Sequence, residues 1–369
     1  MILTLSERLR YWLDGFKSFV YPPRPTLPAK PWHPDSDAAL TQNLNDSTLA
    51  APHPNSSRFI AHLKSTSTPP SGIYTGVAKP TSTGVVNGNP LNAALPTDKL
   101  YTVSRDPGPN NIQITTGFNS SYGAKVRYNS RRMMQQGNPM QGYSDSKLHI
   151  YDNTTTPPTI TELQNFRDPG NANLGLYADG ATQYPTSQPS TSPPTSGRSS
   201  ARQPLAELTL RYDDVVKRGH VQRSSYGARA PRHTYIYPAL ASDGPVGRPP
   251  TQAGPYPATP DTPDAPPMGI ILKFNSAARL RLINAGITRT KNPQTHAILD
   301  CYEQCGIIQV DTGGHNSTHL EPDPRWDQVD LSALARITLD DFTCYYLKPP
   351  TPTPPNVAHD YEAGYTKGY

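Results

Sequence analysis

Proline is the residue that most limits how this chain can fold. The sequence has 43 prolines among its 369 residues, about 12%, where a share of roughly 5% is usual. Because proline lacks the backbone N–H and blocks helix interiors, helical bundles and coiled coils are disfavoured. Collagen is excluded because no Gly-X-Y period occurs. No run of about 18 apolar residues is present, so a membrane-spanning helix is not expected.

The prolines gather in particular segments. A tether covers residues 21–34, flexible inserts lie near 181–203 and 242–267, and residues 348–369 form an extended tail that also carries tyrosines. These segments are too polar, or too rich in proline, to pack into a core. Residues 35–347 are therefore expected to form a single β-rich domain interrupted by the two inserts.

The first 20 residues predict an amphipathic helix. Apolar Leu5, Leu9 and Phe16 fall on one face at helical spacing, while Arg10 and Asp14 fall on the other. The segment lacks the continuous apolar stretch of a standard signal peptide. Such a helix on a proline-rich tether either docks on a partner or membrane surface or packs on its own domain, and both alternatives stay open.

Short apolar runs separated by turns predict the folded centre. We expect strands at 125–128, 147–151, 233–237, 269–274, 307–310 and 343–347. Short helices are expected at 212–218, 295–304 and 330–336, with Gly306 ending the second. The expected fold class is α+β and β-rich, with an antiparallel or mixed sheet core, a few short helices, long proline-rich loops and extended terminal arms.

Charge and cysteine content exclude some partners and cofactors. The net charge of +5 is modest and scattered, so nucleic acid is not expected as a partner. Cys301, Cys305 and Cys344 allow at most one disulfide, such as Cys344 with one of the other two; the alternative is three small buried apolar side chains. The histidines are dispersed and no C-x-x-C occurs, so no metal site and no cofactor are expected.

Two groups of residues are candidates for catalysis or sugar binding. His220, which follows a helix and a glycine, is a candidate acid or base, and Asp311 before a Gly-Gly pair is a candidate carboxylate. Trp326 and Arg325 are candidates for carbohydrate binding, because an aromatic face suits a sugar ring. The alternatives are structural: helix-end capping for His220, turn chemistry for Asp311 and core anchoring for Trp326.

Asn-X-Ser/Thr triplets supply candidate glycosylation sites. They begin at Asn45, Asn55, Asn119, Asn153 and Asn316. The number only slightly exceeds what chance gives for this composition, so it is weak support for an exported glycoprotein.

Residues 204–346 contain a set of short motifs: a histidine after a short helix, a Tyr-x-x-Pro-Ala strand, Pro-Pro-Met-Gly, Asp-x-Gly and Asp-Pro-Arg-Trp-Asp; here they are His220, Tyr235–Ala239, Pro266–Gly269, Asp311–Gly313 and Asp323–Asp327. This set resembles that of a family of mostly secreted, functionally unassigned bacterial proteins. Val221 and Gln222 after the histidine, and Thr312, depart from the family pattern. The resemblance implies an extracellular β-rich fold and supplies no reaction.

Three functions remain open from the sequence. The first is an extracellular or cell-surface structural protein, a wall or filament component, whose N-terminal helix and C-terminal tail dock onto copies of itself or other subunits. The second is a polysaccharide-acting enzyme or a carbohydrate-binding module that uses His220, Asp311 and Trp326. The third is an accessory subunit of a large complex. No recognisable catalytic motif is present, so the sequence alone favours a non-enzymatic role.

Overall fold

The computed structural model describes the central part of the chain. The described residues are 43–66, 74–76, 91–105, 123–129, 147–168, 175–178, 180–186, 199, 201, 203–219, 223–228, 232–239, 264–312, 316–321 and 324–348. The expected N-terminal helix and its tether lie outside these residues, as do most of the C-terminal tail and most of the insert at 242–267. The described residues confirm the expected fold class, β-rich with a few short helices and mixed sheets.

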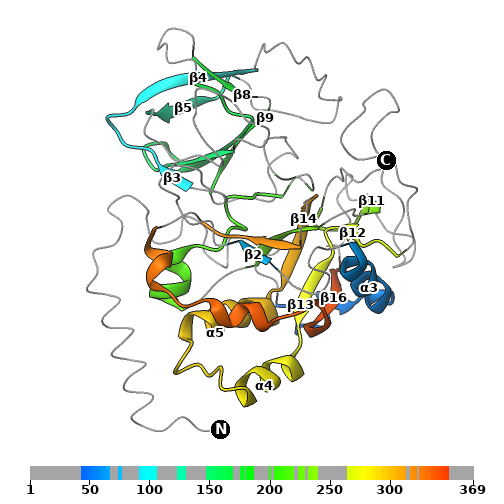
Figure 1. Ribbon diagram of the computed structural model, residues 1–369. Helices are drawn as coiled ribbons and strands as arrows, with labels where there is room; N and C mark the ends of the chain where they lie inside the picture. The colour runs from blue at the N-terminus through cyan, green and yellow to red at the C-terminus, as the bar shows by residue number, and fades with distance from the viewer. Residues whose placement is uncertain are drawn as a thin grey trace.

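A seven-stranded mixed sheet forms the lower part of the molecule (Figure 1). In spatial order its strands are β1 (Ala50–Pro52), β16 (Phe342–Leu347), β13 (Ile271–Phe274), β14 (Ile307–Thr312), β10 (Ser224–Ala228), β15 (Ser317–His319) and β2 (Tyr74–Gly76). The β10–β14 and β15–β2 pairs are parallel, and the other neighbours run antiparallel.

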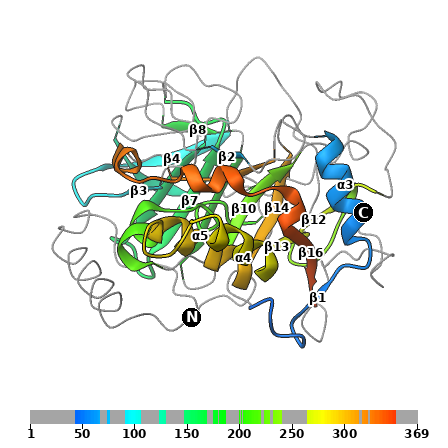
Figure 2. The ribbon, with the colours of Figure 1, turned by 60° about the horizontal axis from the view of Figure 1, so that its bottom comes forward.

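Helices cover one face of this sheet, as seen from below in Figure 2. The helices are α3 (Ser56–Thr66), α4 (Ser276–Asn284) and α5 (Pro293–Gln304). Alternation along β13 sends Leu272 and Phe274 into the core shared with the helices, and Ile271 into a second core on the opposite face. Both faces of the central strands are therefore buried.

Shorter helices complete the lower part. They are the π-helix η2 (Asp213–Arg218) and the 3-10 helices η3 (Pro324–Gln328), η4 (Ser332–Arg336) and η5 (Leu339–Asp341). A two-stranded pair, β11 (Arg232–Tyr235) with β12 (Pro267–Met268), adjoins the second core through Met268. The short helices expected at 212–218 and 330–336 are thus confirmed, although their hydrogen-bond patterns are π and 3-10 rather than α.

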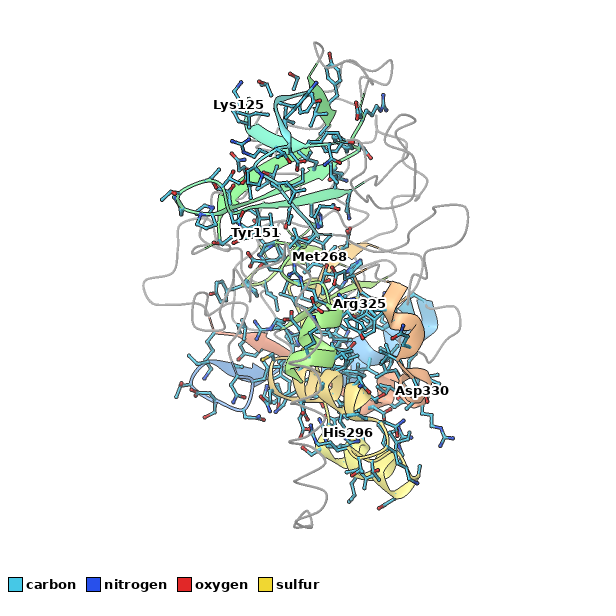
Figure 3. The ribbon with its side chains drawn as sticks, turned by 90° about the vertical axis from the view of Figure 1, so that its left-hand side faces the viewer. Lys125, Tyr151, Met268, His296, Arg325 and Asp330 are labelled. Carbon is cyan, nitrogen blue, oxygen red and sulfur yellow. The ribbon has the colours of Figure 1, made fainter. Side chains whose placement is uncertain are left out.

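Two smaller sheets form the upper part (Figure 1). One contains β3 (Leu91–Ala93), β6 (Leu148–Asp152), β7 (Thr159–Gln164) and β9 (Gly180–Pro185); the other contains β5 (Lys125–Tyr128), β4 (Lys99–Arg105) and β8 (Leu176–Ala178). Their shared core includes Val103, Tyr128, Leu148, Ile150 and Phe166. Figure 3 shows Lys125 and Tyr151 in this part, and His296 and Asp330 in the lower part.

The prediction of a flexible insert near 181–203 is partly wrong. Ala181 and Thr182 are fully buried in β9, which pairs along its whole length with β7. Ala201 and Leu205 are also buried, in the core beside β14. The polar composition misled the prediction, because Ala and Thr side chains fit a pleated sheet whose neighbours supply the apolar contacts. Residues 187–198 lie outside the described part of the chain.

Gly306 lets strand β14 begin directly after α5, as expected. Its φ is 72°, and its N–H donates to the Cys301 carbonyl at 2.9 Å, which ends the helix. A Cβ built at this position would overlap Ile271 Cγ2 and lie 2.8 Å from Leu44 Cδ1. The glycine is therefore required both by the backbone conformation and by close packing.

We predict that Gly306→Ala destabilises the protein by about 3 kcal/mol or more, because a left-handed backbone strain of ~1–2 kcal/mol adds to overpacking of ~1–3 kcal/mol. Gly286→Ala is the matched control, since Gly286 also follows a helix with a positive φ, 86°, but a Cβ there meets nothing within 4 Å. The Gly286→Ala variant should lose only the part of the unfolding free energy that the backbone strain costs. Urea unfolding measures both; equal losses would contradict the packing argument.

Candidate functional site

A cluster of buried polar side chains lies where the upper and lower parts meet. It contains Lys147 and His149 from the upper part, and Ser225, Asp311 and His319 from the lower sheet. Protein interiors hold few such groups unless they are paired, so the cluster needs a physical account.

Strand register brings the lower residues together. Tyr226 of β10 lies opposite Thr318 of β15, and Gly227 lies beside Asp311 of β14 after a bulge. The antiparallel β10–β15 pairing therefore sets Ser225 next to His319. Their side chains meet, with Ser225 Oγ and His319 Nδ1 2.7 Å apart. Ser225 is fully buried, whereas His319 is partly exposed.

Alternation along β6 supplies the upper residues. Leu148 and Ile150 point into the upper core, so Lys147 and His149 lie on the opposite face of the strand. Lys147 Nζ lies 3.1 Å from Asp311 Oδ2, and the two side chains are 6% and 19% exposed. The ion pair therefore joins β6 to the carboxyl end of β14 across the junction, with little competition from water.

One connecting segment, residues 203–212, lies against both parts. Ala206 N donates to Glu162 Oε1 of β7 at 2.8 Å, and Leu208 O accepts from Ser225 N at 2.7 Å. Leu210 N donates to His319 O at 2.9 Å. These bonds hold the buried Arg211 close enough for its charge to act on His149.

Both histidines of the cluster are neutral at physiological pH. Burial, reinforced by the positive charge of Lys147, lowers the pKa of His319 to about 4, although Asp311 opposes the shift. Burial, with the charges of Lys147 and Arg211, lowers the pKa of His149 to about 3. A neutral imidazole can accept a proton, so the cluster holds two bases close to charged Lys147, Arg211 and Asp311.

The structure describes one of the two residues that the sequence predicts to be catalytic. Asp311 lies in the cluster, paired with Lys147. His220 lies outside the described residues, so its proposed partnership with Asp311 stays a prediction. Across the described residues, no group of three His, Cys, Asp or Glu side chains is arranged to hold a metal ion.

Trp326 and Arg325, the candidate sugar-binding pair, make contacts that are typical of a core anchor. Trp326 is 3% exposed, its Nε1 donates to Glu321 O at 2.9 Å, and its ring packs edge-on against Tyr212. Arg325 lies over the Tyr212 ring and donates to Asp213 Oδ1 at 2.8 Å. A buried indole cannot stack on a sugar, so the structure matches the anchoring interpretation.

The cysteines form no disulfide. Cys301, Cys305 and Cys344 are all buried, and burial raises the pKa of Cys344 to about 12. The alternative of three small buried side chains therefore holds: Cys301 and Cys344 lie in the core that the helices share with the sheet, and Cys305, directly after α5, is also buried.

The candidate glycosylation asparagines differ in how far their side chains are exposed. Asn45 and Asn153 are exposed and Asn55 is half-buried, while Asn119 lies outside the described residues. Asn316 is 1% exposed, accepts a hydrogen bond from Tyr226 and donates to Leu63 O at 3.2 Å. A glycan cannot be carried on that buried amide, so Asn316 is corrected to a structural residue.

Sequence reasoning missed Lys147, His149, Arg211, Ser225 and His319 as site residues. One signal was available for β6, where Lys-Leu-His-Ile-Tyr alternates polar and apolar residues at period two. Ser225 and His319 carried no such signal, because their juxtaposition depends on the pairing of β10 with β15, which are distant in sequence.

Among the described residues, no helix is both long enough and apolar enough to cross a bilayer. No protein-family model, no curated protein and no solved structure matches this chain. The resemblance to secreted bacterial proteins therefore stays a prediction.

We predict that Asp311→Asn lowers the free energy of unfolding by about 3 kcal/mol, because it removes the carboxylate paired with a buried lysine. Asp340→Asn is the control, since Asp340 pairs with Lys64 at 2.7 Å on the surface, where its side chain is 61% exposed. That change should cost less than about 1 kcal/mol. Denaturant unfolding of both variants would refute the buried-pair account if their losses were equal.

We predict that stability falls as pH drops from about 6.5 toward 4. The unfolded chain protonates histidine near pH 6.5, but folded His319 and His149 take up protons only near pH 4 and pH 3. Acid therefore favours the unfolded state, by up to about 1.4 kcal/mol per pH unit for each histidine.

The double variant His149→Gln/His319→Gln isolates this effect. Other titrating groups, including His296, contribute to both proteins alike, so the double variant should show a shallower slope of unfolding free energy against pH. Parallel slopes in urea titrations between pH 4.5 and 7 would be inconsistent with neutral buried histidines.

Proposed function

We propose that this protein is an enzyme that acts on a polysaccharide by acid–base chemistry, with His319 as the general base. The observation that carries the proposal is the hydrogen bond between Ser225 and His319 inside the buried polar cluster. A base whose ring is fixed by a second side chain is the arrangement that general-base catalysis requires.

The geometry favours His319, rather than Ser225, as the group that meets the substrate. Ser225 is fully buried, so its Oγ is poorly placed to act as a nucleophile, whereas His319 is partly exposed. With the Nδ1 proton donated to Ser225 Oγ, the Nε2 lone pair of His319 is available as a base. The lowered pKa keeps the ring in this neutral form. Ser225 is therefore a positioning residue.

The charged groups around His319 favour removal of a proton from a sugar hydroxyl or from the sugar ring. Lys147 supplies a positive charge that favours negative charge developing on the substrate. The negative charge of Asp311 raises the pKa of His319 and so opposes the effect of burial. The Asp311 side chain is 19% exposed, and His319 is also partly exposed. Hydrolysis by two carboxylates is not the favoured route, because Asp311 is paired with a lysine, and Glu162, opposite His149, is fully buried and accepts hydrogen bonds from Tyr184 and Ala206.

The assembly role favoured by the sequence stays a prediction. It depends on docking through residues 1–34 and 348–369, nearly all of which lie outside the described residues. Extracellular localisation and the role of accessory subunit are likewise predictions that no contact described above supports or opposes.

We predict that the purified full-length chain releases reducing ends from a polysaccharide panel, and that His319→Ala lowers kcat at least about 100-fold. Ser225→Ala should lower kcat less, by loosening the ring, and alter the pH profile. His53→Gln is the control, because His53 is buried against Phe59 outside the cluster. The proposal fails if no polysaccharide yields reducing ends, or if His319→Ala retains full activity.

A further inference from the structure

The connecting segment at 203–212 bonds to the backbone of both members of the Ser225–His319 pair. Leu208 O accepts from Ser225 N at 2.7 Å, and Leu210 N donates to His319 O at 2.9 Å. The two bonds come from residues only two positions apart in the chain. A shift of this segment would therefore move both backbones, and with them the contact between Ser225 Oγ and His319 Nδ1.

The strands of the pair do not bond to each other at this point. The register of β10 with β15 consists of two residue pairs, and neither contains Ser225 or His319. Ser225 pairs instead with Ile308 of β14, and His319 with Gly76 of β2, the strands on the outer sides. The connecting segment therefore supplies backbone bonds to both residues at the end of the β10–β15 ladder.

Glu162 of β7 attaches the same segment to the upper part. Its side chain is fully buried, and its Oε1 accepts from Ala206 N and from Tyr184 Oη, both at 2.8 Å. Ala206 also packs in a small core of the upper part. The carboxylate thus holds the segment to the upper sheet two residues before Leu208, where the segment bonds to the lower sheet.

Apolar packing places the segment but does not set its backbone direction. Leu205 and Leu208 pack in the core beside β14, and Leu210 packs in the core under the helices. Figure 3 labels one residue from the core on each side of the segment, Tyr151 in the upper part and Met268 in the lower part. Apolar contacts are non-directional, whereas a hydrogen bond fixes the direction of the N–H that it holds.

We propose that Glu162 is a positioning residue for the base: through the segment at 203–212 it sets the distance and orientation between Ser225 and His319, an inference that rests on the proposed function. Glu162 acts from the buried side of the site and has no contact with the substrate in this account. The base remains His319.

A carboxylate provides both an oxygen acceptor in a fixed place and a negative charge. The β6–β7 register sets Glu162 opposite His149, so an effect of the charge on the histidines is the competing explanation. Glu162→Gln keeps an oxygen acceptor at the same reach and removes the charge. Glu162→Asp keeps the charge and shortens the reach by one methylene. A positioning role predicts that only the Glu162→Asp variant is impaired.

Amide hydrogen exchange of the full-length chain measures this coupling without a substrate. In Glu162→Asp we expect the Ser225 and Leu210 amides to exchange about 10-fold faster than in the wild type. The Gln309 amide, which is bonded within the central sheet, should keep its rate and so report that the fold is intact. Glu162→Gln should leave all three rates near those of the wild type.

Tyr184→Phe is the matched control, because it removes the other donor to Glu162 Oε1 and leaves the Ala206 bond in place. It should not change the exchange of the Ser225 or Leu210 amides. In the wild-type chain the Ala206, Ser225 and Leu210 amides should open as one unit, with the same dependence on urea. Independent opening would contradict the inference even if Glu162→Asp fails to fold.

Turnover separates the inference from the proposed function. On the polysaccharide that yields reducing ends, Glu162→Asp should lower kcat about 10-fold with little change in KM, because the base is displaced. Glu162→Gln should keep both kcat and the pH profile. Unchanged Ser225 and Leu210 exchange in Glu162→Asp, or equal impairment of the two Glu162 variants, overturns the inference. Faster local exchange in a chain whose wild type has no activity refutes the proposed function and keeps the coupling.

Discussion

The ion pair between Lys147 and Asp311 is the contact on which the rest of the site depends. It joins Lys147, directly before β6, to the carboxyl end of β14, 164 positions apart in the chain, at the junction of two separately packed cores. Burying both charges is costly, and their mutual attraction in a site of low polarity offsets that cost only in good geometry. Burial is the larger cause of the lowered pKa of both histidines, and the lysine charge that the pair fixes beside them lowers the pKa further.

The polar composition of this cluster is typical of a functional site and unusual for a hydrophobic core. The apolar cores have a different composition: the lower part buries Phe274, Ile298 and Tyr302 around the helices, and the upper part buries Val103 and Phe166. A purely structural junction could have been apolar at lower cost. Strained or unsatisfied polar groups are instead typical of places where a ligand completes the hydrogen bonding.

Local signals in the sequence predicted much of the fold and little of the site. The helix at Pro293–Gln304, its end at Gly306 and the following strand carry apolar periodicity and a glycine, so they were predictable. Strand β10 reads Ser-Ser-Tyr-Gly-Ala and β15 reads Ser-Thr-His, which have weak strand propensity of their own. They become strands because β14 and the segment at 208–210 supply hydrogen-bond partners, a non-local effect that one sequence does not display. Trp326 and Arg325 allowed two interpretations from sequence, because a compact motif suggests a site as readily as a core anchor.

The central claim is that His319 is a neutral base held through Nδ1 by Ser225. Nitrogen-15 NMR of the full-length chain, with imidazole signals assigned through His319→Gln, measures its tautomer and its titration together. The account predicts the Nδ1–H tautomer at pH 7 and an apparent pKa near 4. A His319 that titrates near its ordinary value of about 6.5, or that carries its proton on Nε2 when neutral, would contradict it.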